Sequence, residues 1–139
     1  MKIDDCKLTP LRILPSEKGA VMHALRSTDE GFAAFGEAYF STVKKGVTKG
    51  WKRHRRMTLN LVVPVGHIRF MLQDDRPGSP TYGQTDEVEL SPENNYQRLT
   101  VPPGVWLAFE GMADGTNLLL NIADLPHDPT EVESKTDDR

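Results

Sequence analysis

The sequence predicts an all-β, antiparallel fold, built as a sandwich or a barrel. Short segments alternate between apolar and polar residues, as expected of strands that bury one face. Turn-forming residues, mainly Gly, Pro and Asn, separate these segments at close intervals, which is typical of antiparallel β folds. No amphipathic helix of useful length is apparent. A chain of 139 residues favours one domain.

The regular pattern begins at Glu37, whereas residues 1–35 contain short apolar pieces interrupted by prolines and predict an arm. Beyond Pro129 the chain is polar and is expected to be disordered. We therefore expect one barrel domain with its arm over residues 1–129 and a tail over residues 130–139. The predicted strands are Glu37–Val43, Thr48–Val63, Ile68–Gln73, Asp86–Leu90, Tyr96–Val101, Val105–Phe109 and Asn117–Ile122.

The segment Gly46–Gly66 is the centre of the predicted site. Lys52, His54 and Arg56 occupy every second position, so a strand would direct them to the same face. Three cations on one face are costly to bury unless an anion or a solvated pocket meets them. We interpret this face as the inside of an open barrel and the wall of a ligand site.

Charge and cysteine content exclude several classes of function. The basic run from Lys44 to Arg56 invites a nucleic-acid interpretation, but the formal net charge of -3 argues against a nucleic-acid partner. Cys6 is the only cysteine, so no internal disulfide can form. No signal-peptide core is present, nor any stretch of the ~18 apolar residues that a membrane span needs. We therefore expect a cytoplasmic protein.

Two stretches resemble the cupin motifs in their spacing. Gly46, Lys52-x-His54, Leu59 and Gly66 match the first motif, and Pro102–Gly104 followed by Leu107 matches the second. Cupins use three histidines and one glutamate of these motifs to hold a metal, and only His54 remains here. The resemblance therefore implies a small double-stranded β-helix, the cupin or jelly-roll barrel, and one imidazole predicts no metal or other cofactor.

Within the cupins, the chain resembles dTDP-4-dehydrorhamnose 3,5-epimerases and the related dTDP-4-keto-6-deoxyhexose ketoisomerases. That family contains the words KGVLRGLH, DIR…SPTFG, LSxEN and IPxG in the same order. The corresponding stretches here are Lys45–Trp51 (KGVTKGW), Asp74–Gln84 (DDRPGSPTYGQ), Leu90–Asn94 (LSPEN) and Val101–Gly104 (VPPG). The resemblance implies an isomerase that acts on a nucleotide sugar without a metal, and a homodimer.

The chain departs from the epimerase pattern at several catalytic positions. Lys52 stands where the epimerases carry the histidine that removes the proton beside the ketone. The ketoisomerases have a further histidine two positions later, where His54 stands. A second family histidine is Leu107 here, and an aspartate that orients the epimerase base falls near Phe70. The epimerase acid–base set is therefore not intact.

Three residues are the candidates for catalysis. His54 can be a general base, because imidazole titrates near neutral pH, or a structural histidine. Lys52 can pair with the substrate, serve as an amine catalyst with a lowered pKa, or remain a solvated charge. Tyr39 can donate a proton or a hydrogen bond to an enolate oxygen, or simply pack in the core.

Four further residues are candidates for substrate binding. Lys49 takes the place of a family arginine that faces phosphate, and Arg56 belongs to the cationic face. Arg76 can bind phosphate or brace its loop beside Asp74. Trp106 can stack on a nucleobase or pack.

The predicted function is epimerisation or keto-isomerisation of a nucleotide-linked 4-keto-6-deoxyhexose, for a surface polysaccharide or a deoxysugar. An alternative is a binding protein that keeps the sugar-nucleotide or carbohydrate pocket but has lost catalysis.

Overall fold

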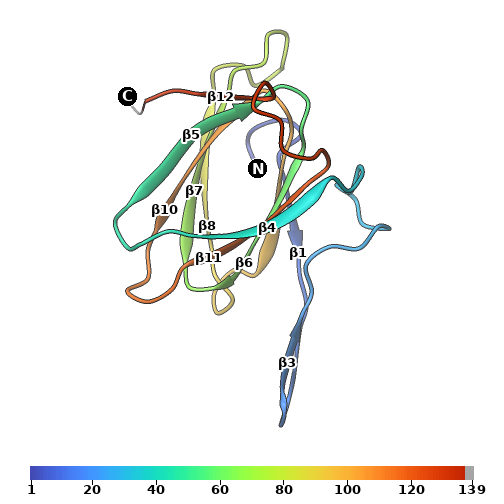
Figure 1. Ribbon diagram of the computed structural model, residues 1–139, viewed down its shortest axis with the longest axis vertical. Coiled ribbons are helices and arrows are strands. Elements are labelled where there is room, and N and C mark those ends of the chain that lie inside the picture. Colours follow the sequence, from blue (N-terminus) through green and yellow to red (C-terminus); the bar gives the residue numbers. More distant parts are fainter. Residues whose placement is uncertain (137–139) are drawn as a thin grey trace.

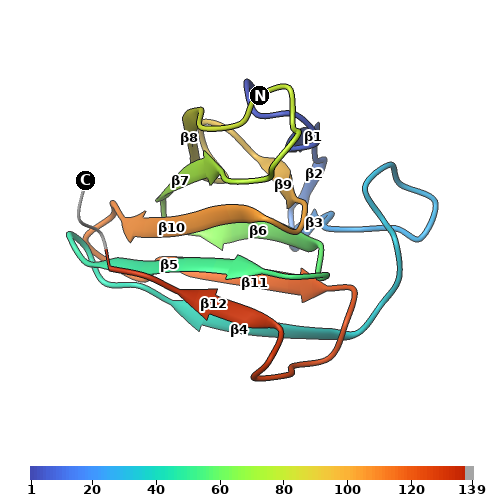
Figure 2. The same ribbon diagram turned by 90° about the horizontal axis from the view of Figure 1, so that it is seen from above.

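The computed structural model describes residues 1–136, which fold as a barrel of two five-stranded antiparallel sheets (Figures 1 and 2). No helix occurs in this part of the chain, and the predicted all-β jelly-roll fold is confirmed. In the first sheet the strands run in the order β1 (Lys7–Pro10), β9 (Gln97–Val101), β6 (Leu59–Val65), β11 (Leu118–Ala123) and β4 (Glu37–Thr42). In the second sheet the order is β12 (Val132–Ser134), β5 (Thr48–His54), β10 (Val105–Gly111), β7 (Ile68–Asp74) and β8 (Thr85–Leu90).

The apolar core fills only one half of the space between the sheets. Phe70 and Leu72 from β7 meet Leu61 and Leu99 from the first sheet, and all four are completely buried. Toward β4, β5 and β11 the inward side chains become smaller or polar, and the packing opens into a cavity. The packed half supplies the hydrophobic stabilisation, and the open half leaves room for a ligand.

The predicted strand Thr48–Val63 is wrong in one respect, because a turn divides it into β5 and β6. The buried carboxylate of Glu131 accepts hydrogen bonds from the backbone N–H groups of Arg56 and Met57. The N–H of Arg55 donates to the carbonyl oxygen of Glu131 over 2.9 Å. Because Glu131 accepts from the backbone N–H groups of the turn, these groups need no partner in a neighbouring strand, and β5 can end at His54.

The tail that the sequence predicts to be disordered contributes a strand. β12 pairs with β5, and Glu133 lies opposite Arg53 in the register. Arg53 donates a hydrogen bond to the carboxylate of Glu133 over 2.9 Å. The polar composition that suggested disorder is therefore explained by ion pairs on the outside of the second sheet. The remainder of the predicted tail, residues 137–139, lies outside the described residues.

The arm is anchored to the first sheet by a buried cation. Arg98 on β9 is completely buried and donates to Asn60, to the carboxylate of Asp29 and to the carbonyl oxygens of Ala24 and Glu30. A buried guanidinium requires this many acceptors, so Arg98 fixes residues 24–30 of the predicted arm to the first sheet. Another part of the predicted arm, the hairpin of β2 (Ile13–Ser16) and β3 (Gly19–Met22), projects away from the barrel (Figure 1).

Candidate functional site

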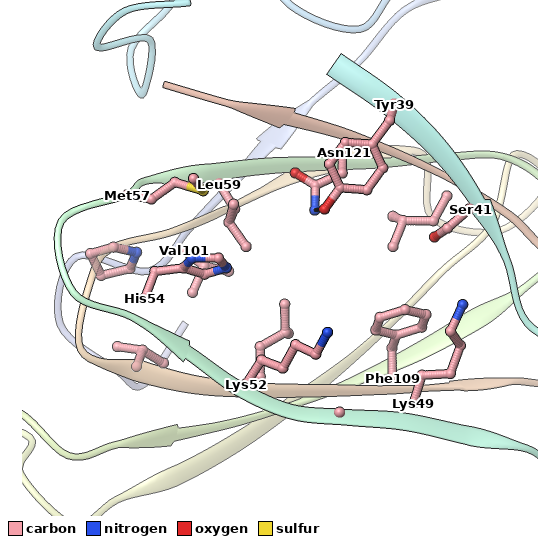
Figure 3. A pocket seen from close by; sticks show the side chains of 15 residues that line it. Tyr39, Ser41, Lys49, Lys52, His54, Met57, Leu59, Val101, Phe109 and Asn121 are labelled. Carbon is pink, nitrogen blue, oxygen red and sulfur yellow. Dashed lines mark hydrogen bonds between the residues drawn. The ribbon is translucent and has the colours of Figure 1, made fainter. Parts of the chain in front are cut away.

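A cavity of about 180 Å³ opens between the two sheets in the unpacked half of the barrel (Figure 3). Cationic side chains line one wall, a tyrosine and an asparagine line the opposite wall, and apolar side chains lie between them. The lining residues are Tyr39, Ser41, Lys49, Gly50, Lys52, His54, Met57, Leu59, Val101, Pro102, Val105, Leu107, Phe109, Leu119 and Asn121.

The cationic wall depends on a β-bulge in β5. Leu107 pairs with Lys52 and Ala108 with Gly50, so the register shifts by one residue at Trp51. Leu107 and Phe109 both face the cavity, and their partners Lys52 and Lys49 therefore face it too. Without the bulge, strict alternation would direct Lys49 outward. The bulge brings Lys49 to the same face as Lys52 and His54.

Gly50 is required by this arrangement. Its φ is 118°, in the region that side chains disfavour. A Cβ atom at this position would lie 2.7 Å from the carbonyl oxygen of Leu107 and 2.8 Å from the Cα of Ala108. The glycine therefore lets β5 approach β10 closely enough for the bulge to form.

The two lysines differ in their surroundings. The Lys49 ammonium donates to the carbonyl oxygen of Thr42 over 3.1 Å and lies 5.8 Å from the ring centre of Phe109. The Lys52 ammonium is exposed toward the cavity (Figure 3) and has no ion-pair partner among residues 1–136. Lys52 is therefore available to an anion or to a developing oxyanion.

The surroundings of His54 favour its neutral form. Burial lowers the pKa of its imidazole, Lys52 lowers it further, and the carboxylates of Glu131 and Asp124 only partly oppose this. Its Nδ1 atom is buried and has no hydrogen-bond partner within the described part of the chain. A neutral imidazole in a cavity, beside a free ammonium, has the properties of a general base.

The opposite wall is formed by a cross-strand pair. Tyr39 on β4 pairs with Asn121 on β11, and the side-chain amide of Asn121 donates to the Tyr39 hydroxyl over 3.1 Å. Burial, followed by the negative charge of Glu37, raises the pKa of Tyr39, so the phenol keeps its proton. Asn121 was missed from the sequence, although a single polar residue in the apolar run LLLNIA was a usable signal.

The structure brings together His54, Lys52, Tyr39 and Lys49, but three other predicted residues lie elsewhere. Arg56 does not continue the cationic face, because β5 ends at His54. Its side chain is 69% exposed and pairs with Glu131 over 3.1 Å. Arg76 braces its loop, as the alternative interpretation proposed. Its guanidinium donates to Asp74 over 2.8 Å and to the carbonyl oxygen of Asp4.

Trp106 also lies outside the cavity, on the outer face of the second sheet. Its indole N–H donates to Asp75 over 3.1 Å, and the guanidinium of Arg53 and the ammonium of Lys135 each lie 4.6 Å from the ring centre. These contacts occupy the ring, so the prediction that it stacks on a nucleobase finds no support in its position.

The cavity contains one imidazole and no carboxylate or thiol. In the described part of the chain, three or more His, Cys, Asp or Glu side chains nowhere gather as a group that could hold a metal ion. Nor do residues 1–136 include a helix long and apolar enough to cross a membrane.

Comparison with known proteins gives consistent matches. The family model described as dTDP-4-dehydrorhamnose 3,5-epimerase matches residues 1–138. A protein of Haloferax volcanii named "Probable low-salt glycan biosynthesis epimerase Agl13" is 30% identical over 121 residues, covering 86% of this chain and 77% of that protein. The spore coat polysaccharide biosynthesis protein SpsL of Bacillus subtilis is 26% identical over 133 residues, covering 96% of this chain and 87% of that protein. The crystal structure of a dTDP sugar isomerase from Desulfovibrio desulfuricans G20 is similar with a TM-score of 0.94 and 41% identity, covering 98% of this chain and 87% of that one.

Proposed function

Because the chain belongs to the dTDP-4-dehydrorhamnose 3,5-epimerase family, we propose that it epimerises or keto-isomerises a nucleotide-linked 4-keto-6-deoxyhexose. The relatives named for glycan and spore coat polysaccharide biosynthesis support a role in making a surface polysaccharide. Nucleotide sugars are made in the cytoplasm, and we place the protein there.

The observation that carries the proposal is the neutral, unpartnered His54 beside the free ammonium of Lys52 in one cavity. His54 removes the proton from a carbon next to the ketone. The electron pair of that C–H bond becomes the C=C bond of an enediolate, and the carbonyl π pair moves to oxygen. Lys52 stabilises the resulting oxyanion.

The reaction is completed from the opposite wall. Tyr39 donates its proton to the other face of the same carbon, which gives the epimer, and solvent then removes the extra proton from His54 and returns one to Tyr39. In keto-isomerisation His54 instead returns the proton to the former carbonyl carbon. The hydroxyl on the first carbon loses its proton and becomes the new ketone, and the oxyanion gains a proton and becomes a hydroxyl. In epimerisation the raised pKa of Tyr39 keeps the phenol protonated until it is needed.

Lys49 is the proposed contact for the diphosphate. It lies on the same strand as Lys52, three residues away, and the bulge directs both to the cavity. An ammonium that already donates one hydrogen bond to Thr42 keeps two donors for phosphate oxygens.

Deuterium exchange tests the function directly. With dTDP-4-keto-6-deoxyglucose in D₂O, the protein is expected to introduce deuterium at a carbon beside the ketone. We expect His54→Gln to slow exchange by roughly 10²- to 10⁴-fold and Lys52→Met by roughly 10²-fold. Lys44→Gln is the control, because Lys44 belongs to the same basic run but does not line the cavity. Tight binding of the nucleotide sugar with no exchange would instead favour the binding protein.

We also propose that the protein acts as a homodimer. The outer side of β4 and the segment before it expose Phe40 and Phe35, which are 64% and 65% exposed. The projecting hairpin exposes Leu14 and Val21. Large apolar side chains that a molecule leaves exposed favour burial against another copy.

A further inference from the structure

One polar atom in the cavity has no role in the chemistry described so far. The side-chain oxygen of Asn121 is buried and has no hydrogen-bond partner within the described part of the chain. The residue as a whole is only 8% exposed. A buried amide oxygen without a donor is costly, so the site is incomplete until something donates to it.

We propose that Asn121 is a specificity-determining residue whose side-chain oxygen accepts a hydrogen bond from a hydroxyl of the sugar, while its amide nitrogen positions the Tyr39 phenol. This inference rests on the proposed function, because it assigns one substrate group to the same cavity. It adds a requirement for a free hydroxyl on the sugar ring.

The neighbours of Asn121 on β11 leave its side-chain oxygen as the one inward hydrogen-bond acceptor of that strand's side chains. The inward residues of β11, all within the described chain, are Leu119, Asn121 and Ala123, so the amide stands alone among apolar neighbours. Across the cavity lie two of the three proposed catalytic side chains, His54 and Lys52 (Figure 3). A group that meets the Asn121 oxygen therefore belongs to the part of the ligand that reacts.

Because the Asn121 side-chain oxygen is an acceptor, only a hydrogen-bond donor of the nucleotide sugar can pair with it. Phosphate oxygens and the ketone oxygen are acceptors themselves and cannot donate to Asn121. The sugar hydroxyls can donate, and so can the N–H of the nucleobase. A sugar hydroxyl is favoured because Asn121 shares its wall with Tyr39, the proposed proton donor. The amide nitrogen of Asn121 donates to the Tyr39 hydroxyl over 3.1 Å.

The two halves of the amide act together. The amide nitrogen fixes the phenol oxygen as an acceptor, and this directs the phenol proton away from Asn121. The amide oxygen orients the sugar by one of its hydroxyls. One side chain thus sets the position of the proton donor relative to the carbon that it protonates.

The test is a binding cycle in which both the residue and the hydroxyl are removed. Wild-type protein and Asn121→Leu are titrated calorimetrically with dTDP-4-keto-6-deoxyglucose, with its 2-deoxy and 3-deoxy analogues, and with dTDP alone. Wild type is expected to bind one of the deoxy analogues roughly 10- to 100-fold more weakly than the parent sugar. Asn121→Leu is expected to bind that analogue and the parent sugar equally.

Two further variants separate the assigned role from a general effect on the fold. Asn121→Asp keeps an acceptor at this position and is expected to retain the discrimination. Ile122→Val, on the same strand but facing the outer side, is the matched control and is expected to behave as wild type. Thermal unfolding of each variant checks that it is folded.

The outcomes are distinguishable from those of the proposed function, because affinity and deuterium exchange are separate measurements. If wild type discriminates but catalyses no deuterium exchange, the proposed reaction fails and the Asn121 assignment stands. Equal discrimination by wild type and Asn121→Leu against both deoxy analogues would overturn the assignment. A loss of affinity for dTDP alone in Asn121→Leu would also overturn it, because the occupant would then be the nucleobase.

Discussion

At the scale of single residues, the pKa of His54 connects the geometry of the cavity to a measurable pH dependence. Burial and the charge of Lys52 both favour the neutral imidazole. A base with a lowered pKa stays deprotonated to lower pH than a free histidine, whose pKa is about 6.5. Activity that depends on neutral His54 is therefore lost only as the pH falls below that value.

We predict that Lys52→Met shifts the acid limb of the kcat/KM profile to higher pH. Removing the positive charge removes one of the causes that hold the pKa of His54 down, so the imidazole gains its proton earlier as the pH falls. The shift is measured from pH–rate profiles and, independently, from the NMR titration of the His54 ring. An acid limb that stays in place would contradict the assignment of His54 as the base.

The residue scale also shows what the sequence could predict about the site. His54, Lys52 and Tyr39 were identified from family words and strand alternation, and the structure places all three on the cavity. Arg56 was misplaced, because the hydrogen bonds that end β5 come from Glu131, far away in the sequence. Asn121 was overlooked, because its importance depends on an unpaired oxygen that only the packing reveals.

At the scale of elements, the pairing of β5 with β10 decides which side chains face the cavity, and the alternation of residues alone does not predict it. The bulge in β5 changes which lysines share a face, and it depends on the close approach of β10 at Gly50. A bulge of this kind has no reliable sequence signature, since any strand containing a glycine could host it. The positions of the strands along the chain after Glu37, by contrast, were largely predicted from turns and alternation.

β12 and the residue before it support the catalytic strand from outside the cavity. The Glu131 carboxylate is buried and accepts from the Arg56 and Met57 N–H groups in the turn that follows His54. Burial raises the pKa of Glu131, but the hydrogen bonds from Arg56 and Met57 outweigh it and the net pKa is lowered. Its stabilising contribution is therefore present above the pKa of an unfolded glutamate and is lost as the pH falls through the lower, folded value.

We predict that Glu131→Ala destabilises the protein by about 3 kcal/mol, because two backbone donors lose their acceptor. Urea unfolding at neutral pH measures the change. The same variant is expected to lower kcat by about 10-fold, since the end of β5 that positions His54 is loosened. Glu133→Gln is the control and is expected to cost about 1 kcal/mol or less, because its ion pairs lie partly exposed on the sheet surface. Equal losses in both variants would argue against a special role for the turn.

At the scale of the whole molecule, the proposed dimer would bury the apolar side chains that β4 and the projecting hairpin expose. We predict that the protein elutes as a dimer in size-exclusion chromatography with light scattering, and that Phe40→Asp elutes as a monomer. A carboxylate on this surface would be desolvated by the partner, which disfavours association. Tyr82→Ser removes another exposed aromatic side chain, on a different loop, and is expected to leave the dimer intact. A wild-type monomer at all concentrations would contradict the proposal.

The division of the barrel into a packed half and a hollow half has a consequence for how such proteins diversify. Some side chains that hold the sheets together, such as Phe70 and Leu99, do not line the cavity. Replacing a polar lining side chain such as Lys52 or Ser41 removes little of that packing, so it costs little in folding free energy and leaves the chain above the threshold for stability. The chemistry of the cavity can thus change through a few polar replacements while the packed core stays as it is.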